Sequence, residues 1–260
     1  MNYPYLFTIT GGRTGTAWLA RLLGENLGIP AVHEPVGIDD FGFRMPDIKI
    51  MRTFNERGNT ELIQRFYKGK LDEIAGQNAY VETNHTLAKC GLVENLANHA
   101  IAPQTCLIIL RRDLFKQCIS YQNRRDFMNT TIVWQWYLHY SYRNIIVDTQ
   151  PFIHLGSMAQ AIWYAYEMGA RQLYYKRLYA DKLAMIECDL EDINTADGAS
   201  RLFQALGVPT IATLPPVANT NVAGEDPEMA RRMRDALPTV DCNLERMVDA
   251  YLQSGRRLDR

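Results

Sequence analysis

Hydrophobic and polar positions follow a recognisable order at the start of the chain. Residues 5–9 form an apolar run rich in aromatic and β-branched side chains, which is typical of a buried strand. Apolar side chains then recur at helical spacing over residues 18–27. A glycine-containing turn, residues 11–16, separates the two runs. The pattern therefore predicts a strand, a tight turn and a helix.

Strand-like and helix-like patterns continue to alternate along the chain. Residues 35–60 show little periodicity, so we expect a long loop there. The alternation favours an α/β fold, a three-layer sandwich with a central parallel sheet, formed as a single domain by residues 1–260. The further predicted strands cover residues 80–83, 105–110 and 183–187, and the further predicted helices cover residues 60–75, 87–100, a segment after residue 113 and a segment ending near residue 206.

Composition narrows the class of protein. A chain of 260 residues with 47% hydrophobic content is long enough to bury one sizeable core. The formal net charge of −1 gives no sign of a nucleic-acid-binding surface. The five cysteines are scattered and indicate neither a disulfide framework nor a zinc site. Because no stretch of sequence is apolar enough to span a bilayer and no charged leader precedes the first strand, we expect a soluble, cytoplasmic protein without a transmembrane segment.

The turn between the first strand and the first helix has the features of an anion-binding loop. Glycines 12 and 15 let backbone N–H groups converge, and the helix dipole adds to the attraction. Arg13 supplies a cation, and Thr14 and Thr16 supply hydroxyl groups. The Gly-Lys-Ser/Thr sequence of a Walker A loop is missing, which argues against an ordinary ATPase or GTPase. In the alternative interpretation, one threonine caps the helix and the arginine faces solvent.

A second basic segment follows the strand predicted at residues 105–110. This strand is continuously apolar, as expected for a parallel sheet that is covered on both faces, and it ends in Arg111, Arg112 and Asp113. Ligands of α/β sheets bind at the carboxyl ends of strands, and the arginine fork suits a phosphate group. A phosphate site is one interpretation, and a solvated cap with internal ion pairs is the other.

Together the two segments resemble the sulfotransferase family that uses 3′-phosphoadenosine-5′-phosphosulfate (PAPS) as donor. Residues 13–18 are similar to the family's first loop, and Arg112, followed by Asp113 and later by Ser120, is similar to its second motif. The resemblance implies a P-loop NTPase-like sulfotransferase fold and PAPS as co-substrate, with adenosine 3′,5′-bisphosphate (PAP) as product and no metal. It implies that Arg112 and Ser120 hold the 3′-phosphate. The residues implied to bind the 5′-phosphosulfate are Gly12, Arg13, Thr14, Gly15, Thr16 and Ala17.

Three residues near predicted strand ends are candidates for the base that takes the proton of an acceptor hydroxyl. By resemblance, His85 follows a strand as the family's catalytic histidine does, Glu82 lies in that strand, and Glu34 precedes Pro35 as in bacterial relatives. We rank His85 first and Glu34 second, because histidine titrates near neutral pH without tuning, whereas the pKa of a glutamate must be raised. Arg13 is the candidate for stabilising charge on the leaving oxygen.

The acceptor is less well defined by the sequence. About half of the aromatic residues lie between residues 121 and 179. Trp134, Trp136 and Tyr140 are candidates for acceptor contact, with core packing as the alternative. We expect a small-molecule, glycan or lipid acceptor, and the sequence predicts no oligomeric state.

Two other functions stay open at this level. One is a P-loop small-molecule kinase that uses Mg·ATP, with Asp113 or Glu34 as the magnesium ligand, although the missing lysine counts against it. The other is a non-catalytic nucleotide-binding protein on the same fold. The basic residues at both anion sites favour the enzyme.

Overall fold

The computed structural model describes residues 1–127, 137–209, 211–216 and 226–260 of the chain. At its centre lies a five-stranded sheet in the order β2-β3-β1-β4-β5, and every neighbouring pair of strands is parallel. The prediction of an α/β fold with a central parallel sheet is therefore confirmed. The strands are β1 (Tyr5–Ile9), β2 (Ala31–His33), β3 (Tyr80–Thr83), β4 (Thr105–Arg111) and β5 (Ala184–Asp189).

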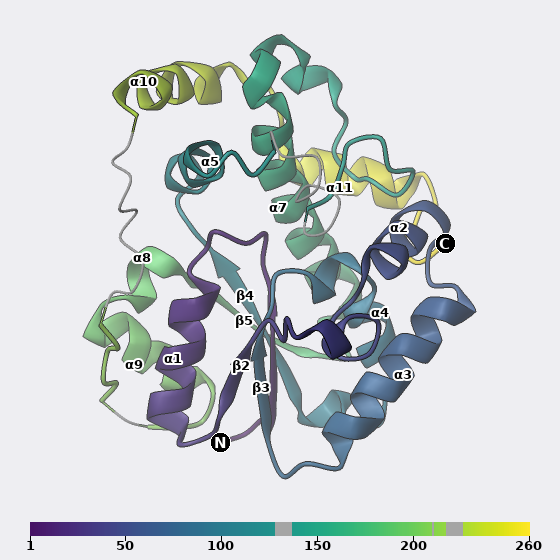
Figure 1. Cartoon of the computed structure of the whole chain (residues 1–260), viewed down its shortest axis with the longest axis vertical. Helices are drawn as coiled ribbons and strands as arrows, with labels where there is room; N and C mark the ends of the chain where they lie inside the picture. Colours follow the sequence, from purple (N-terminus) through teal and green to yellow (C-terminus); the bar gives the residue numbers. More distant parts are fainter. Residues whose placement is uncertain (128–136, 210, 217–225) are drawn as a thin grey trace.

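Helices connect the strands and extend beyond the sheet (Figure 1). No helix of the described residues is long and apolar enough to cross a membrane. The α-helices are α1 (Thr16–Leu27), α2 (Ile48–Arg57), α3 (Glu61–Ala75), α4 (Leu92–Leu96), α5 (Leu114–Asn123), α7 (Ala159–Tyr179), α8 (Leu190–Ile193), α9 (Ala196–Ala205), α10 (Pro227–Ala236) and α11 (Leu244–Gln253). The 3₁₀ helices are η1 (Ile38–Asp40), η2 (Leu87–Lys89), η3 (Ala102–Gln104), η4 (Gln150–Met158) and η5 (Leu237–Thr239).

Both faces of the sheet are covered, as the apolar strand patterns predict. Side chains alternate between the two faces along a strand. Leu6 of β1 belongs to the apolar cluster formed with α1 and α9, whereas Phe7 belongs to the larger cluster formed with α3 and α7. In Figure 1, α1 and α9 accordingly lie on one side of the sheet and α3 on the other. The layers form the predicted three-layer sandwich.

The segment from residue 35 to 60 differs from the expected loop, because α2 occupies much of it. Ile50 and Phe54 are buried at helical spacing, and the Asp47 carboxylate caps the helix by accepting a hydrogen bond of 2.7 Å from Ile50 N. The polar residues among these apolar positions hide the helical period in the sequence. The helix predicted over residues 87–100 is also divided, into η2 and α4.

Chain topology brings the two predicted anion-binding segments together. After β1 the chain builds β2 and β3 on one side of β1 and then crosses to β4 on the other side. The carboxyl ends of β1 and β4 therefore form the topological switch point, where open α/β sheets bind ligands. The loop of residues 10–15 leaves β1 at this point, and Arg112 leaves β4 beside it.

Candidate active site

The loop between β1 and α1 is held through its carbonyl groups. The Gly11 carbonyl oxygen accepts a hydrogen bond of 2.7 Å from the Tyr164 hydroxyl, and the Gly12 carbonyl oxygen lies 3.0 Å from the Tyr121 hydroxyl and 3.1 Å from Gln117 Nε2. Within the described part of the chain, the backbone N–H groups of residues 12–16 donate to no protein acceptor. Amides of this kind at the start of a helix attract an anion.

Glycine is required at two positions of the loop. Gly12 and Gly15 have φ angles of 80° and 86°, which L side chains rarely adopt. A Cβ on Gly12 would lie 3.0 Å from Cγ of His85, and a Cβ on Gly15 would lie 2.6 Å from Cδ1 of Leu190. Gly12 therefore allows the His85 ring to pack directly against the loop between β1 and α1.

Basic side chains from the two segments meet at the switch point. Arg13 Nε donates a hydrogen bond of 2.9 Å to Ser120 Oγ on α5. Arg112 Nη1 donates a hydrogen bond of 2.8 Å to the Arg13 carbonyl oxygen. Arg112 Nε is buried and has no hydrogen-bond partner among the described residues. A buried donor without a partner is costly, and an oxygen of a bound phosphate would satisfy it.

The positive charges at this point repel one another. Burial lowers the pKa of Arg13, and the nearby guanidinium groups of Arg124 and Arg112 lower it further. Asp126 and Tyr137 oppose this effect only in part. A bound anion would relieve the repulsion, so the electrostatics of the site favour a phosphate or sulfate ligand.

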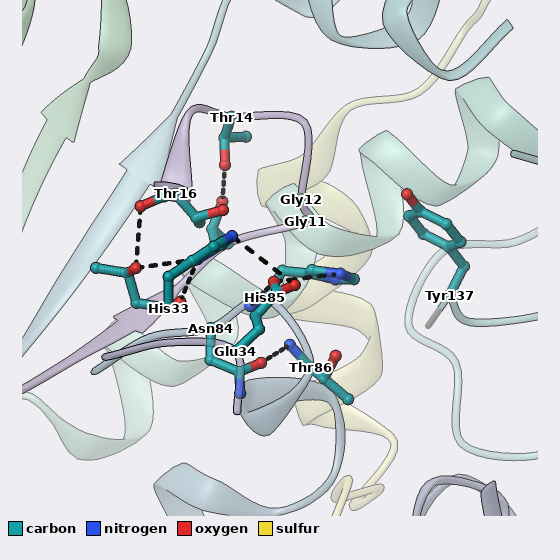
Figure 2. Close-up of polar contacts among 12 residues, drawn as sticks. Gly11, Gly12, Thr14, Thr16, His33, Glu34, Asn84, His85, Thr86 and Tyr137 are labelled. Carbon is teal, nitrogen blue, oxygen red and sulfur yellow. Dashed lines mark hydrogen bonds and ion pairs between the residues drawn. The ribbon is translucent and has the colours of Figure 1, made fainter. Parts of the chain in front are cut away.

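The hydroxyl and helix-start residues of the loop have different partners. The hydroxyls of Thr14 and Thr10 lie 2.5 Å apart, so the Thr14 side chain stabilises the loop itself (Figure 2). The Thr16 carbonyl oxygen accepts a hydrogen bond of 2.9 Å from Thr83 Oγ1, which ties α1 to β3. Ala17 lies in the first turn of α1. Anion binding by Thr16 and Ala17 stays a prediction.

Glu34 and His85 lie together, although 51 residues separate them in the chain. His85 Nε2 is 3.5 Å from Glu34 Oε1, and His33 Nε2 is 4.0 Å from Glu34 Oε2 (Figure 2). Glu34 has a φ angle of 47°, a strained value for a residue with a side chain. Arg13, at 56°, shares this feature, and such strain is concentrated at functional sites. The structure thus places two of the three candidate bases side by side.

The environment of His85 changes the ranking of these bases. Its ring is buried and stacks on Tyr137 with centroids 5.6 Å apart. Burial lowers the pKa of His85 well below its usual value, and the nearby cations, Lys89 first, lower it further. This weakens the case for His85 as the final proton acceptor, and the neighbouring carboxylate of Glu34 is the alternative candidate that we carry forward.

Glu82, the third candidate, is bound to structural partners. Its Oε2 lies 2.7 Å from Lys70 Nζ and accepts a hydrogen bond of 2.9 Å from the Tyr80 hydroxyl. Its Oε1 accepts a hydrogen bond of 2.9 Å from Asn84 Nδ2. Both members of the ion pair are buried. This geometry favours a structural role for Glu82 over a role as base.

We therefore expect Glu82→Gln to lower stability rather than chemistry. The change leaves the buried Lys70 ammonium without a counter-charge, which costs about 3–5 kcal/mol of unfolding free energy. Urea unfolding measures the loss, and the exposed Glu73, paired with Arg44, provides a control, Glu73→Gln, with a cost of about 1 kcal/mol or less. A stable Glu82→Gln protein that had lost catalysis would contradict the structural role.

The predicted aromatic acceptor contacts are only partly covered by the structure. Trp134 and Trp136 lie outside the described residues. Tyr140 is exposed and packs edge-on against Trp163, with ring centroids 6.2 Å apart. Residues 137–141 are not helical: they comprise a bend, an irregular stretch and a turn. Acceptor contact by Tyr140 stays a prediction.

Three residues of the site carry little signal in the sequence. Arg124 and Tyr137 reach it from a segment beyond α5, through contacts that spacing cannot predict. The third residue is Lys89, whose Nζ atom lies 2.8 Å from Nδ1 of His85. Its position four residues after His85, one helical turn, is the signal that could have identified it.

Comparison with known proteins gives matches to solved structures only. No model of a known protein family matches the sequence, and no curated protein gives a significant match. A sulfotransferase from Alicyclobacillus acidocaldarius aligns over 99% of this chain and 100% of its own, with a TM-score of 0.46 and 13% identity. The sulfotransferase domain from the curacin biosynthetic pathway aligns over 99% of each chain, with a TM-score of 0.48 and 14% identity.

These two structures are sulfotransferases, the class that the two loop motifs resemble. At such TM-scores and identities the similarity concerns the arrangement of helices and strands alone. The case for a function therefore depends on this chain's own residues.

Proposed function

We propose that this chain is a PAPS-dependent sulfotransferase that transfers a sulfuryl group to an acceptor hydroxyl. The observation that carries the proposal is the meeting of Arg13, Arg112 and Ser120 beside an amide-lined loop at the carboxyl ends of β1 and β4. A donor with a phosphate at each end of its ribose needs two adjacent anion sites. The loop of residues 12–17 supplies one, and Arg112 with Ser120 supplies the other.

The surroundings of Arg112 fit a nucleotide. A cavity of about 400 Å³ borders Gly11, Thr14 and Arg112, within the size range of small-ligand sites. The partnerless Arg112 Nε and the mutual repulsion of the arginines both favour occupation of this region by phosphate. PAPS is the candidate that uses both anion sites.

Catalysis by this site would combine proton removal with charge stabilisation. The acceptor oxygen forms a bond to sulfur while the bond from sulfur to the 5′-phosphate oxygen of PAP breaks. The hydroxyl proton passes to the Glu34–His85 pair. Arg13 and the loop amides stabilise the negative charge that develops on the leaving phosphate oxygen.

The acceptor side of the proposal rests on the segment that follows Glu34. A cavity of about 700 Å³ is lined by Phe41, Pro46 and Ile48, with Lys49 and Arg52 adding positive charge. We assign this cavity to an acceptor with an apolar body. Exposed large apolar side chains are concentrated in this segment: Val36, Ile38, Phe41, Phe43 and Ile48.

The segment also connects this cavity with the catalytic pair. The segment begins directly after Glu34. Further along it, the sulfur of the buried Met45 lies 3.0 Å from Nδ2 of Asn84, the residue before His85. We propose that an acceptor held in this cavity extends along this segment toward the residues that remove its proton.

We expect Ile48→Asp to raise the KM for an apolar phenol or long-chain alcohol about tenfold, because burying an isoleucine contributes about 1.5 kcal/mol or more. The Kd for PAP should stay unchanged. Ile153→Asp, also at an exposed isoleucine, is the control and should alter neither value. An unchanged KM in Ile48→Asp would exclude this cavity as the acceptor site.

The direct test of the function is turnover of PAPS with a panel of phenols, alcohols and sugars, followed by mass spectrometry. The proposal predicts a sulfated product and an equal amount of PAP. Transfer of phosphate from Mg·ATP to the same acceptors would instead support a kinase. Asp113 now caps α5, because its carboxylate accepts a hydrogen bond of 2.9 Å from Lys116 N. As a magnesium ligand in a kinase, Asp113 would have to give up this capping hydrogen bond.

A further inference from the structure

Lys89 occupies a fully buried position behind the catalytic pair. Its Nζ lies 2.8 Å from His85 Nδ1 and donates a hydrogen bond of 3.0 Å to the Tyr164 hydroxyl. The ammonium also lies over the rings of Tyr137 and Tyr164, at 5.3 Å and 5.4 Å from their centroids. A buried lysine with such partners is costly to keep, so its contacts point to a specific task.

The backbone around Lys89 is fixed from three directions. Every carbonyl of η2 accepts a side-chain hydrogen bond: Leu87 from the Tyr67 hydroxyl at 2.8 Å, Ala88 from the Tyr175 hydroxyl at 2.9 Å, and Lys89 from Asn55 Nδ2 at 2.9 Å. These donors come from α3, α7 and α2. The lysine is therefore presented to His85 by a rigid support.

The chemistry of the ammonium group defines the proton positions of His85. An ammonium has donors and no acceptor, so the Lys89–Nδ1 contact requires a lone pair on Nδ1. In a neutral imidazole the proton then sits on Nε2. That nitrogen faces Glu34 Oε1 at 3.5 Å, so a donor faces an acceptor. In the opposite tautomer, two lone pairs would face each other across this distance.

We propose that Lys89 is a positioning residue that holds His85 in the Nε2–H tautomer, so that the histidine donates toward Glu34 and leaves this carboxylate as the proton acceptor. The inference rests on the proposed function only in assigning Glu34 a substrate proton. Lys89 acts through His85 and touches no reacting atom. Through the Tyr164 hydroxyl, which donates to Gly11 O at 2.7 Å, the same ammonium also supports the anion-binding loop.

The arrangement depends on pH through Lys89. Burial lowers its pKa from 10.5 to about 7, so the ammonium persists below that value and is lost above it. The neighbouring charges act in both directions: Cys90 and Glu34 raise this pKa and Arg171 lowers it, while His33, Arg13 and Arg124 act on His85. We expect the population of the Nε2–H tautomer, which the Glu34 carboxylate also favours, to be highest below about pH 7 and to fall above it.

Nitrogen NMR of the whole chain, labelled with ¹⁵N in the histidine rings, tests the proposal without any substrate. The five histidines give few signals, and His85→Gln identifies those of His85. Below the Lys89 pKa, we expect a protonated Nε2 and an unprotonated Nδ1. An unprotonated Nε2 with a protonated Nδ1 in the unmodified protein would overturn the proposal.

Two variants separate positioning from packing. Lys89→Met keeps the apolar stem and removes the donor to Nδ1, so the population of the Nε2–H tautomer, which Glu34 also favours, should fall, whereas Lys89→Arg keeps a donor and should retain it. An unchanged tautomer in a folded Lys89→Met protein would overturn the proposal. If Lys89→Met does not fold, the spectrum of the unmodified protein still tests the proposal, because it shows which ring nitrogen of His85 carries the proton. Because the readout needs no PAPS, absent sulfuryl transfer with the expected tautomer would contradict the proposed function and leave the Lys89 assignment intact.

Discussion

Glu34→Gln should reduce kcat by about 10²-fold or more while leaving the Kd for PAP unchanged. Glutamine keeps the shape of the side chain but accepts no proton at neutral pH. The carboxylate lies 3.5 Å from His85 Nε2, on a backbone held at a φ angle of 47°, and its side chain is 18% exposed, so an acceptor hydroxyl can reach it. Turnover of PAPS with an apolar acceptor and calorimetry with PAP measure the two quantities.

Two comparisons give this result its meaning. Glu25→Gln, on the exposed side of α1 where Glu25 pairs with Arg21, should leave kcat unchanged. His85→Gln should also reduce kcat, since it removes the donor that faces Glu34. Near-normal turnover in Glu34→Gln, together with a large loss in His85→Gln, would return the role of base to the histidine.

Arg112→Ala should weaken PAP binding about 10- to 100-fold, because a hydrogen bond to a charged group contributes about 1.5–3 kcal/mol. Arg112 supplies a buried Nε without a partner in the described chain, and its Nη1 fixes the carbonyl group of Arg13. Losing the side chain should therefore remove the proposed phosphate ligand and loosen the neighbouring loop. Calorimetric titration of the variant with PAP measures the change.

Arg111→Ala is a closely matched control for this experiment. Arg111 is the adjacent residue of the same strand end and also borders the cavity of about 400 Å³, but its guanidinium binds Glu187 and its Nε lies 3.4 Å from Gln172 Oε1. We expect a change in PAP affinity of less than about threefold, as for a partly exposed, already paired arginine. An equal loss of PAP affinity in both variants would mean that the affinity depends only on the net positive charge of this region. Such a result would contradict a specific phosphate site at Arg112.

The parts of the fold that depend on local pattern were predictable from the sequence. The apolar run at residues 105–110 corresponds to β4, and the helix predicted over 60–75 corresponds to α3. Even there, the start of the helix has no side-chain cap, because the hydroxyl of Thr60, which precedes α3, makes no capping hydrogen bond. The helix α2 was missed because its buried apolar residues, Ile50, Met51 and Phe54, cover little more than one helical turn and leave too short a pattern to show the period.

Only those parts of the candidate site that belong to the two sequence motifs were predictable. Arg13 and Arg112 follow strands whose carboxyl ends meet by topology, so their proximity follows from the pattern of elements. The 3.5 Å contact between His85 and Glu34 depends on the path of the chain after β2 and β3, and no spacing encodes it. The burial that lowers the pKa of His85, and so weakens its case as base, likewise arises only from tertiary packing.

The most direct test of the account is calorimetric titration of the unmodified chain with PAP in the absence of metal, compared with ATP in the presence of Mg²⁺. The two arginine-bearing segments predict saturable binding of PAP without metal and much weaker binding of Mg·ATP. Binding of Mg·ATP in preference to PAP, or binding of neither, would contradict the assignment of the β1 loop, Arg112 and Ser120 to a PAPS site.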